Sequence, residues 1–465
     1  MKQTGKMTSI RDGTAHAAAE FRDDAPRILL AATTRWPLAA RLAMVLRGLG
    51  CSVQVWCPRQ HPVDQLADIA SRHHCSVLRP QHSLRRAINA AQPDLILPCD
   101  DEAVHTLVQL HARCADGDED AAVLRTIARS LGVPAACAQA SARGELMRIA
   151  AAAGARMPQT RVLDSATALE AWAREIGFPA VLKTDRSWGG QGVAVVRDLA
   201  QARAALHLVS HPSWCSALGE WILRRDPAPL LRRLQGQRPA VTIQRYIDGQ
   251  AANRAVACWQ GQTLAGISAL VLRSRSGTGP ATVVRIIDNA QMTDSALRLV
   301  ETLGLSGLCG FDFVIERASG TAYLIEINPR ATPVCHLPLG VDQDLPVALL
   351  NRLYERQRPL RYEPIGGAAI ALFPGEWQRD PCSPFLHEAH HDVPWGECDL
   401  VRECLSPPWE ERGLAARLRL WWGSRVASAP KPAALQPENT PLRSDYGSST
   451  EGDDQRMRAS LRRSQ

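Results

Sequence analysis

The chain has 465 residues, of which 45% are hydrophobic and 22% are charged, and its formal net charge is +7. This is the composition of an ordinary globular protein with room for two or three domains. The positive excess is modest and no basic–aromatic module accompanies it, which argues against a nucleic-acid-binding protein.

The cysteines and the N-terminus bear on the cellular compartment. Thirteen cysteines are scattered singly, with no CxxC pair, as is typical of free thiols in a reducing environment, and this spacing argues against a zinc site. Residues 1–25 lack the apolar core of a signal peptide, and no run approaches eighteen apolar residues. We therefore expect a flexible leader over 1–25, no stable membrane association and a cytoplasmic protein.

Residues 26–125 predict alternating strands and helices. Strands are expected at 27–32, 51–57 and 93–99, and helices at 37–50, 85–92 and 100–112. Such alternation implies an α/β domain built on a parallel sheet. The first strand-to-helix turn, ATTRWP at 32–37, lacks the GxGxxG pattern, so a dinucleotide site is not expected there.

The remainder of the chain predicts helix over 126–160 and then a mixed α+β region. Strands are expected at 180–184, 193–196, 241–247, 253–259, 267–272, 281–288, 310–316 and 322–328, and a helical, arginine-rich stretch between 196 and 241. A helix at 345–357 opens a C-terminal extension over 341–425. Residues 426–465 have the composition of a disordered tail.

Lys183 leads into a glycine-rich segment and is the only lysine between Lys6 and Lys431, although the chain has 54 Lys and Arg residues. The segment DRSWGGQG at 185–192 joins two expected strands, which excludes a P-loop or a Rossmann turn because both lead from a strand into a helix. A glycine hairpin can instead lie as a flap over phosphates, with the Lys183 ammonium beside them. The alternative is a tight hairpin with an incidental lysine.

The segment GFDFVIERASGTAYLIEINPR at 310–330 predicts a β-hairpin with its turn near Ser319. Its alternation places Asp312 opposite Glu326, and Val314 opposite Leu324. The expected apolar faces consist of Phe311, Phe313 and Ile315 on one strand, and of Tyr323, Ile325 and Ile327 on the other.

Two facing carboxylates destabilise a ladder unless a positive group lies between them. Asp312, Glu326 and Asn328 offer the oxygen ligands that Mg²⁺ prefers, and Arg330 can bind phosphate or carboxylate oxygens through its guanidinium. The alternative is a solvated hairpin face without a metal. The three functional residue types at 328–330 favour the metal interpretation.

With these motifs the sequence resembles the ATP-grasp superfamily of carboxylate–amine or carboxylate–thiol ligases. The resemblance runs from about Ser141 to Leu339. It implies a pre-ATP-grasp α/β domain over 26–125, followed by a two-subdomain ATP-grasp fold over 126–340 with a lid over about 160–245.

The resemblance also implies the roles of individual residues. Lys183 and Arg330 match the family's catalytic basic residues, and Asp312, Glu326 and Asn328 match its Mg²⁺ (or Mn²⁺) ligands. Gln244 stands where a glutamate is common. The residues that match the ATP-binding positions of the family are Arg143, Lys183, Ser187, Gly189, Gly190, Gln191, Gly192, Gln244, Arg245, Tyr246 and Ile247.

The activity implied is ligation, in which a small carboxylate attacks the γ-phosphate of ATP and an amine or similar nucleophile then captures the acyl phosphate. Arg273, Arg275 and His336 are weaker candidates for substrate binding, with surface ion pairing or core packing as the alternatives. The expected partners are ATP and the two small substrates, without nucleic acid, and a homodimer is left open. A non-catalytic ATP-binding module and an ATP-dependent kinase are the rival functions.

Overall fold

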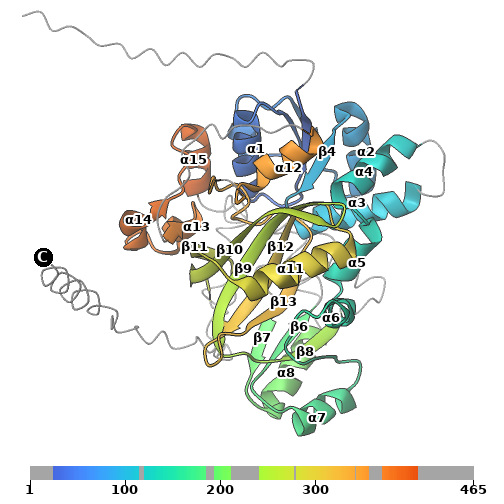
Figure 1. The fold of residues 1–465 in the computed structure, drawn as a ribbon, viewed down its shortest axis with the longest axis vertical. Coiled ribbons are helices and arrows are strands. Elements are labelled where there is room, and N and C mark those ends of the chain that lie inside the picture. Colours follow the sequence, from blue (N-terminus) through green and yellow to red (C-terminus); the bar gives the residue numbers. More distant parts are fainter. Residues whose placement is uncertain are drawn as a thin grey trace, which may run out of the picture. The chain divides into compact units, whose positions relative to one another are not determined.

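The computed structural model describes residues 25–114, 120–184, 193–210, 240–276, 279–340, 342–355 and 369–406 (Figure 1). Within these ranges three β-sheets are covered by helices. The expected combination of an N-terminal parallel sheet with a larger mixed α+β region is confirmed.

The N-terminal sheet is parallel and has the strand order β3-β2-β1-β4. Its strands are β1 (Arg27–Ala31), β2 (Ser52–Cys57), β3 (Ser71–His74) and β4 (Leu95–Pro98). Its helices are α1 (Leu38–Gly48), the 3₁₀ helix η1 (Pro62–Gln65), α2 (Pro80–Ala91) and α3 (Asp101–Cys114). β4 is apolar throughout and β1 is apolar after its exposed first residue, Arg27, because helices cover both faces of the sheet. β3 was not expected from the sequence, since an edge strand with the sequence SRHH has no apolar pattern.

Three helices follow this sheet: α4 (Ala121–Leu131), α5 (Pro134–Ser141) and α6 (Arg143–Ala152). The expected helical region ends earlier than 160, because the chain leaves the helix after Ala152. Gly154 then adopts a φ of +68°, a left-handed conformation that favours glycine.

The largest sheet has the order β13-β12-β9-β10-β11-β14-β15 and is antiparallel except between β14 and β15. Its strands are β9 (Gly249–Trp259), β10 (Gln262–Ser274), β11 (Ala281–Ile287), β12 (Gly307–Glu316), β13 (Ala322–Asn328), β14 (Ala369–Ala371) and β15 (His390–His391). Helix α11 (Ala290–Leu303) packs on one face of this large sheet, and α12 (Leu345–Leu353) packs on the other (Figure 1).

A small antiparallel sheet of order β5-β8-β6-β7 has its own core. It comprises β5 (Thr160–Val162), β6 (Ala180–Thr184), β7 (Val193–Val196) and β8 (Val241–Arg245), with helices α7 (Ala166–Glu175) and α8 (Leu199–Ser210). Trp172, Leu182 and Ile243 are fully or almost fully buried in that core. We call this unit the small sheet.

Residues 342–355 and 369–406 form the described part of the C-terminal extension. The second range contains the short helices α13 (Gly375–Arg379), α14 (Phe385–Glu388) and α15 (Cys398–Leu405). The fully buried Glu376 carboxylate accepts hydrogen bonds from Thr282 of β11, from Ser383 and from Arg379. This carboxylate joins the helices of the extension to strand β11 of the large sheet.

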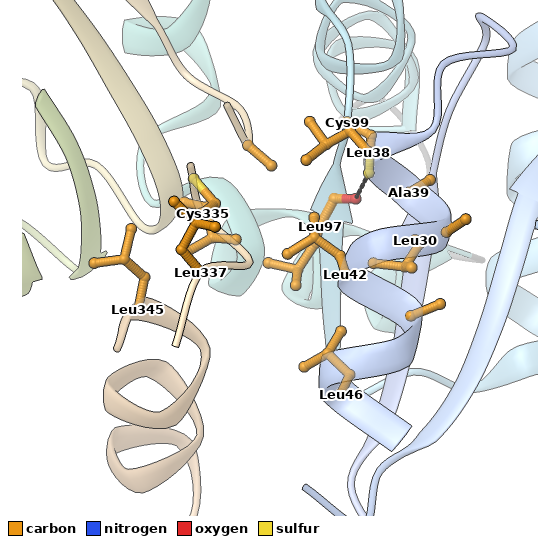
Figure 2. Close-up of a cluster of buried hydrophobic side chains, with 14 of the residues drawn as sticks. Leu30, Leu38, Ala39, Leu42, Leu46, Leu97, Cys99, Cys335, Leu337 and Leu345 are labelled. Carbon is orange, nitrogen blue, oxygen red and sulfur yellow. Dashed lines mark hydrogen bonds between the residues drawn. The ribbon is translucent and has the colours of Figure 1, made fainter. Parts of the chain in front are cut away.

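One apolar core connects the N-terminal sheet with the segment that follows β13. Figure 2 shows Leu30, Leu42 and Leu97 from the N-terminal sheet and its helix α1, and Leu337 and Leu345 from beyond β13. The same cluster includes Ile370 and Leu400 of the C-terminal extension. A backbone hydrogen bond of 3.0 Å from the Ala331 N–H to the Pro98 carbonyl also joins the end of β4 to this segment.

The expected pairing within the 310–330 hairpin is partly wrong. Asp312 lies opposite Glu326 as expected, but a β-bulge follows, so that Phe313 pairs with Leu324 and Val314 with Tyr323. The extra residue on β13 shifts the alternation. Leu324, expected on the acidic face, is therefore buried in the core with Phe311 and Phe313, whereas Tyr323 and Ile325 are only partly buried.

No helix among the residues that the structure describes combines the length and the apolar character needed to span a bilayer.

Candidate functional site

Lys183 is held inside the small sheet by a chain of hydrogen bonds. It is the fourth residue of β6 and is 7% exposed, and its Nζ donates to Gln244 Oε1 at 2.8 Å. Gln244 lies on the neighbouring strand β8, and its Nε2 donates to Thr160 Oγ1 on β5 at 2.9 Å. Three strands thus fix the position of the lysine side chain.

The acidic residues lie in a row across the large sheet. Asp312 on β12 is opposite Glu326 on β13, as the sequence predicted, and it is also opposite Asn253 on β9. Residues directly opposite one another on neighbouring strands project from the same face of a sheet. Asn253 was not among the residues expected from the sequence, although a polar side chain within the alanine-rich strand GQAANRAVACW is a signal for a polar site.

Both carboxylate oxygens of Asp312 accept hydrogen bonds from amides. Asn253 Nδ2 lies 2.6 Å from Oδ1, and Asn328 Nδ2 lies 2.9 Å from Oδ2. Burial raises the pKa of the Asp312 carboxyl above its usual value, and these hydrogen bonds and the charges of Arg330 and Lys183 oppose that rise. Lys183 on the small sheet is therefore near enough to act electrostatically on Asp312 of the large sheet.

Arg330 follows the hairpin and is bound to the N-terminal domain. Its Nε and Nη2 form a bidentate ion pair with Asp101 at the start of α3, at 2.7 and 3.0 Å. Nη2 also donates to Asn328 Oδ1 at 3.1 Å. Burial would lower the pKa of the Arg330 guanidinium, but Asp101, Asp312 and Glu326 hold it above the usual value. The guanidinium thus stays charged beside the acidic row.

Arg245, Tyr246 and Ile247 lie where the chain passes from the small sheet into the large one. The Arg245 guanidinium is 3.8 Å from a Glu316 carboxylate oxygen and 6.0 Å from the centre of the Tyr323 ring. The Tyr246 N–H donates to the Pro179 carbonyl at 3.3 Å, and Ile247 is buried.

A pocket of about 630 Å³ lies between helix α6 and the edge strand β13. It is lined by Gly144, Met147, Arg148, Ala151, Ala155, Arg156, Met157, Pro158, Thr160 and Tyr323. Thr160 connects this pocket to the hydrogen-bonded chain that ends at Lys183.

Two groups of expected ATP-binding residues are not placed in detail. Arg143 is the first residue of α6. The glycine-rich segment, which includes Ser187, Gly189, Gly190, Gln191 and Gly192, lies outside the described residues.

The three weaker substrate candidates all contact the C-terminal extension. The Arg273 guanidinium lies 5.2 Å from the centre of the Phe385 ring, and Arg275 Nη2 donates to Gln378 Oε1 at 2.6 Å. His336 Nε2 is 2.7 Å from Asp392 Oδ2, and Asp392 also pairs with Arg41 of helix α1. These contacts give each residue a packing role at the junction with the extension.

The described residues fit a hard divalent cation. Asp312 and Glu326 supply carboxylate oxygens, and Asn328 and Asn253 supply amide oxygens, which is the ligand type that Mg²⁺ takes. The Asn253 Oδ1 atom is buried and has no hydrogen-bond partner among the described residues. A buried polar atom without a partner is costly, and a cation would satisfy it.

Comparisons with known proteins bear on the domain and the fold. The family model described as an ATP-grasp domain matches residues 231–334. The large chain of carbamoyl phosphate synthase from Thermus thermophilus is 26% identical over 317 residues, which cover 66% of this chain and 27% of that protein. This chain thus matches only about a quarter of that relative's length.

Solved structures show the same fold. A carboxyaminoimidazole ribonucleotide synthase from Aspergillus clavatus, complexed with ATP, superposes with a TM-score of 0.52 at 15% identity, covering 72% of this chain and 78% of that one. A biotin carboxylase from Campylobacter jejuni superposes with a TM-score of 0.51 at 16% identity and covers 72% of each chain. The fold is the one that these two enzymes share. The family model thus assigns an ATP-grasp domain to residues 231–334, as the motifs indicated.

Proposed function

We propose that this protein is an ATP-dependent ligase that joins a small carboxylate to an amine or a similar nucleophile. The observation that carries the proposal is the facing pair Asp312 and Glu326 on the large sheet, together with the buried Lys183 ammonium that Gln244 holds on the small sheet. A nucleotide triphosphate bound between them would meet a cation-binding row on one side and an ammonium group on the other. The similarity to ATP-grasp ligases supports the same function.

The proposed reaction has two steps. A carboxylate oxygen of the substrate attacks the γ-phosphorus of ATP, the bond to the bridging oxygen breaks, and ADP leaves. The nucleophile then attacks the carbonyl carbon of the acyl phosphate and expels inorganic phosphate. Phosphoryl transfer of this kind depends mainly on positioning and on neutralising charge on the transferred group.

Each side chain of the site has a proposed part in that positioning. Lys183 and Arg330 would bind phosphoryl oxygens, and Asp101 and Gln244 would hold these two cations in place through the observed hydrogen bonds. Asp312, Glu326 and Asn328 would hold Mg²⁺ or Mn²⁺, which supplies charge neutralisation at the phosphates. Arg143, Arg245, Tyr246, Ile247 and the glycine-rich segment would bind the rest of the nucleotide.

The cellular setting and the partners are part of the same proposal. The twelve cysteines within the described residues are all free thiols, which supports a reducing, cytoplasmic compartment. The partners proposed are ATP, one carboxylate and one amine.

The release of ADP with panels of small carboxylates and amines tests the proposal. A ligase releases ADP at a high rate only when both co-substrates are present. Release with a single acceptor would indicate a kinase, and nucleotide binding without release under any combination would indicate a regulatory module. Either of these outcomes would replace the ligase proposal.

Glu326→Gln removes one carboxylate of the cation site with almost no change of shape. We expect turnover to fall by about a hundredfold or more, since the loss of one electrostatic contact in the transition state costs roughly 3 kcal/mol. Thermal unfolding without added cation should remain close to that of the wild type, because the fold does not depend on this charge. A variant with normal turnover would exclude Glu326 as a cation ligand.

A further inference from the structure

Asn253 occupies the third position of the acidic row. The register pairs Asn253 of β9 with Asp312 of β12, and Asp312 with Glu326 of β13. On β10, the strand on the other side of β9, the residue opposite Asn253 is the buried Ala269. The polar part of the row therefore consists of Asn253, Asp312 and Glu326.

The orientation of the Asn253 amide follows from its neighbour. An ionised carboxylate only accepts hydrogen bonds, so the amide must present its NH₂ group to Asp312, as the 2.6 Å contact from Nδ2 to Oδ1 shows. Nδ2 also lies 3.4 Å from the Phe311 carbonyl oxygen, a second acceptor. Both acceptors exclude an inverted amide, and the carbonyl oxygen Oδ1 must point away from them.

This carbonyl oxygen differs from that of Asn328. Asn328 Oδ1 already accepts a hydrogen bond from Arg330 Nη2 at 3.1 Å, while its Nδ2 donates to Asp312. Asn253 Oδ1 is buried and has no partner among the described residues. Of the two amides beside Asp312, Asn253 therefore holds the oxygen that is not engaged by an arginine.

We propose that Asn253 is a further member of the cation site and supplies its carbonyl oxygen to the shell of the divalent cation bound by Asp312 and Glu326. The inference rests on the proposed function, since it assumes that these carboxylates bind a cation. It adds a residue of β9 to a site otherwise built from one hairpin. It also gives the buried Oδ1 the partner that the protein alone does not provide.

Two substitutions separate the oxygen of Asn253 from its NH₂ group. Asn253→Ala removes both, whereas Asn253→Asp keeps an oxygen and loses the donor to Asp312. If the oxygen serves the cation, the Ala variant should bind Mn²⁺ about 10- to 100-fold more weakly, the range known for residues that support a metal site. The Asp variant should bind it at least as tightly as the wild type, because a carboxylate replaces an amide oxygen.

The measurement is a titration of the full chain with Mn²⁺, followed by the electron paramagnetic resonance signal of the free ion, with a non-hydrolysable ATP analogue present. Asn89→Ala, at an exposed position of α2, is the matched control and should bind like the wild type. Should the Ala variant fail to fold, the Asp variant decides, since weaker binding by that variant alone would contradict the proposal.

Three results would overturn the inference, and they differ in what else they affect. Wild-type affinity in Asn253→Ala would show that the oxygen has no role. Equal weakening in the Ala and Asp variants would show that Asn253 only donates to Asp312. In both cases Glu326→Gln would still abolish Mn²⁺ binding, and the proposed function would stand. If the wild-type chain binds no Mn²⁺, or binds it no better than Glu326→Gln, both the inference about Asn253 and the proposed function are refuted.

Discussion

Lys183 shows at the scale of one residue why this chain of many arginines has a lysine. The side chain is almost completely buried, and its Nζ is directed to Gln244 by a hydrogen bond of 2.8 Å. A compact ammonium fits a position that is restricted by three strands, whereas a planar guanidinium needs more volume and a wider set of acceptors. The burial of this position therefore indicates that lysine is used here for the small size of its ammonium group, and not for its charge alone.

Lys183→Arg tests this explanation. We expect the rate of ADP formation to fall by about tenfold or more, because overpacking a buried site costs about 1–3 kcal/mol and displaces the charge. Steady-state kinetics with saturating ATP measure the effect. Arg197→Lys, at an exposed position directly after β7, should leave the rate unchanged. A Lys183→Arg variant with normal kinetics would show that charge alone is required.

The residues of the proposed cation site differ in how far the sequence could predict them. Asp312 and Glu326 belong to one hairpin, and counting from its turn was enough to place them opposite each other. Asn253 reaches Asp312 from a strand 59 residues earlier in the chain. No local sequence pattern can reveal this contact, because the contact depends on which strand pairs with β12 and in which register.

The hairpin of β12 and β13 shows at the scale of an element where alternation fails. Its sequence alternates over both strands, yet one extra residue on β13, between Leu324 and Glu326, moves Leu324 into the core. A bulge is stabilised by the packing on both faces of the sheet, so a pattern of period two cannot reveal it. The bulge leaves the pairing of Asp312 with Glu326 intact and changes only the residues beyond it.

Gly310 on β12 allows the loop after β13 to fold back over the sheet. A Cβ atom at this position would overlap Thr332 Cγ2. Thr332 is buried, and its N–H donates to Cys335 Sγ at 3.2 Å, so it has little freedom to move. Glycine is therefore required here for close packing, and not for an unusual backbone angle.

Gly310→Ala should destabilise the protein by about 1–3 kcal/mol, the usual cost of an overpacked core position. It should also weaken activity, because the displaced loop carries Arg330. Gly48→Ala is the control, since a Cβ at that end of α1 meets nothing within 4 Å. Its melting temperature should equal or exceed that of the wild type. Equal melting temperatures for Gly310→Ala and wild type would contradict the packing argument.

At the scale of the whole molecule, the C-terminal extension is attached through residues that the sequence suggested for substrate binding. Arg273, Arg275 and His336 each contact a residue of the extension. A long polar side chain beside an expected cleft looks the same in sequence whether it binds a ligand or another segment. Only the position of the extension distinguishes these roles.

Glu376 makes the attachment of the extension sensitive to acid. Burial would raise the pKa of the Glu376 carboxyl, but hydrogen bonds from Arg379, Ser383 and Thr282 lower it below the ordinary value of 4.5. A carboxyl whose pKa is lower in the folded protein than in the unfolded chain stabilises the folded state at pH values above the unfolded pKa. This stabilisation is lost as the pH falls below the unfolded pKa. The extension should therefore loosen below a pH of about 4.5.

Limited proteolysis from neutral pH to below a pH of about 4.5 measures this loosening of the extension, with cleavage between β14 and α15 as the signal. In Glu376→Gln the extension should be cleaved faster than in the wild type at neutral pH, because the ion pair with Arg379 is lost. The difference between variant and wild type should shrink as the wild-type carboxylate becomes protonated. A difference that stays constant from neutral to acidic pH would exclude Glu376 as the titrating group.

The sequence alone determined the elements whose neighbours lie close along the chain. The apolar runs of β1, β2 and β4 predicted a parallel sheet, and the short hairpin predicted its own facing acids. The tertiary structure decided every contact between distant segments: Asn253 beside Asp312, Asp101 on Arg330, and Asp392 on His336. The physical reason is that hydrophobic periodicity encodes which face of an element is buried, whereas the partner of a buried polar group is selected by the packing of the whole chain.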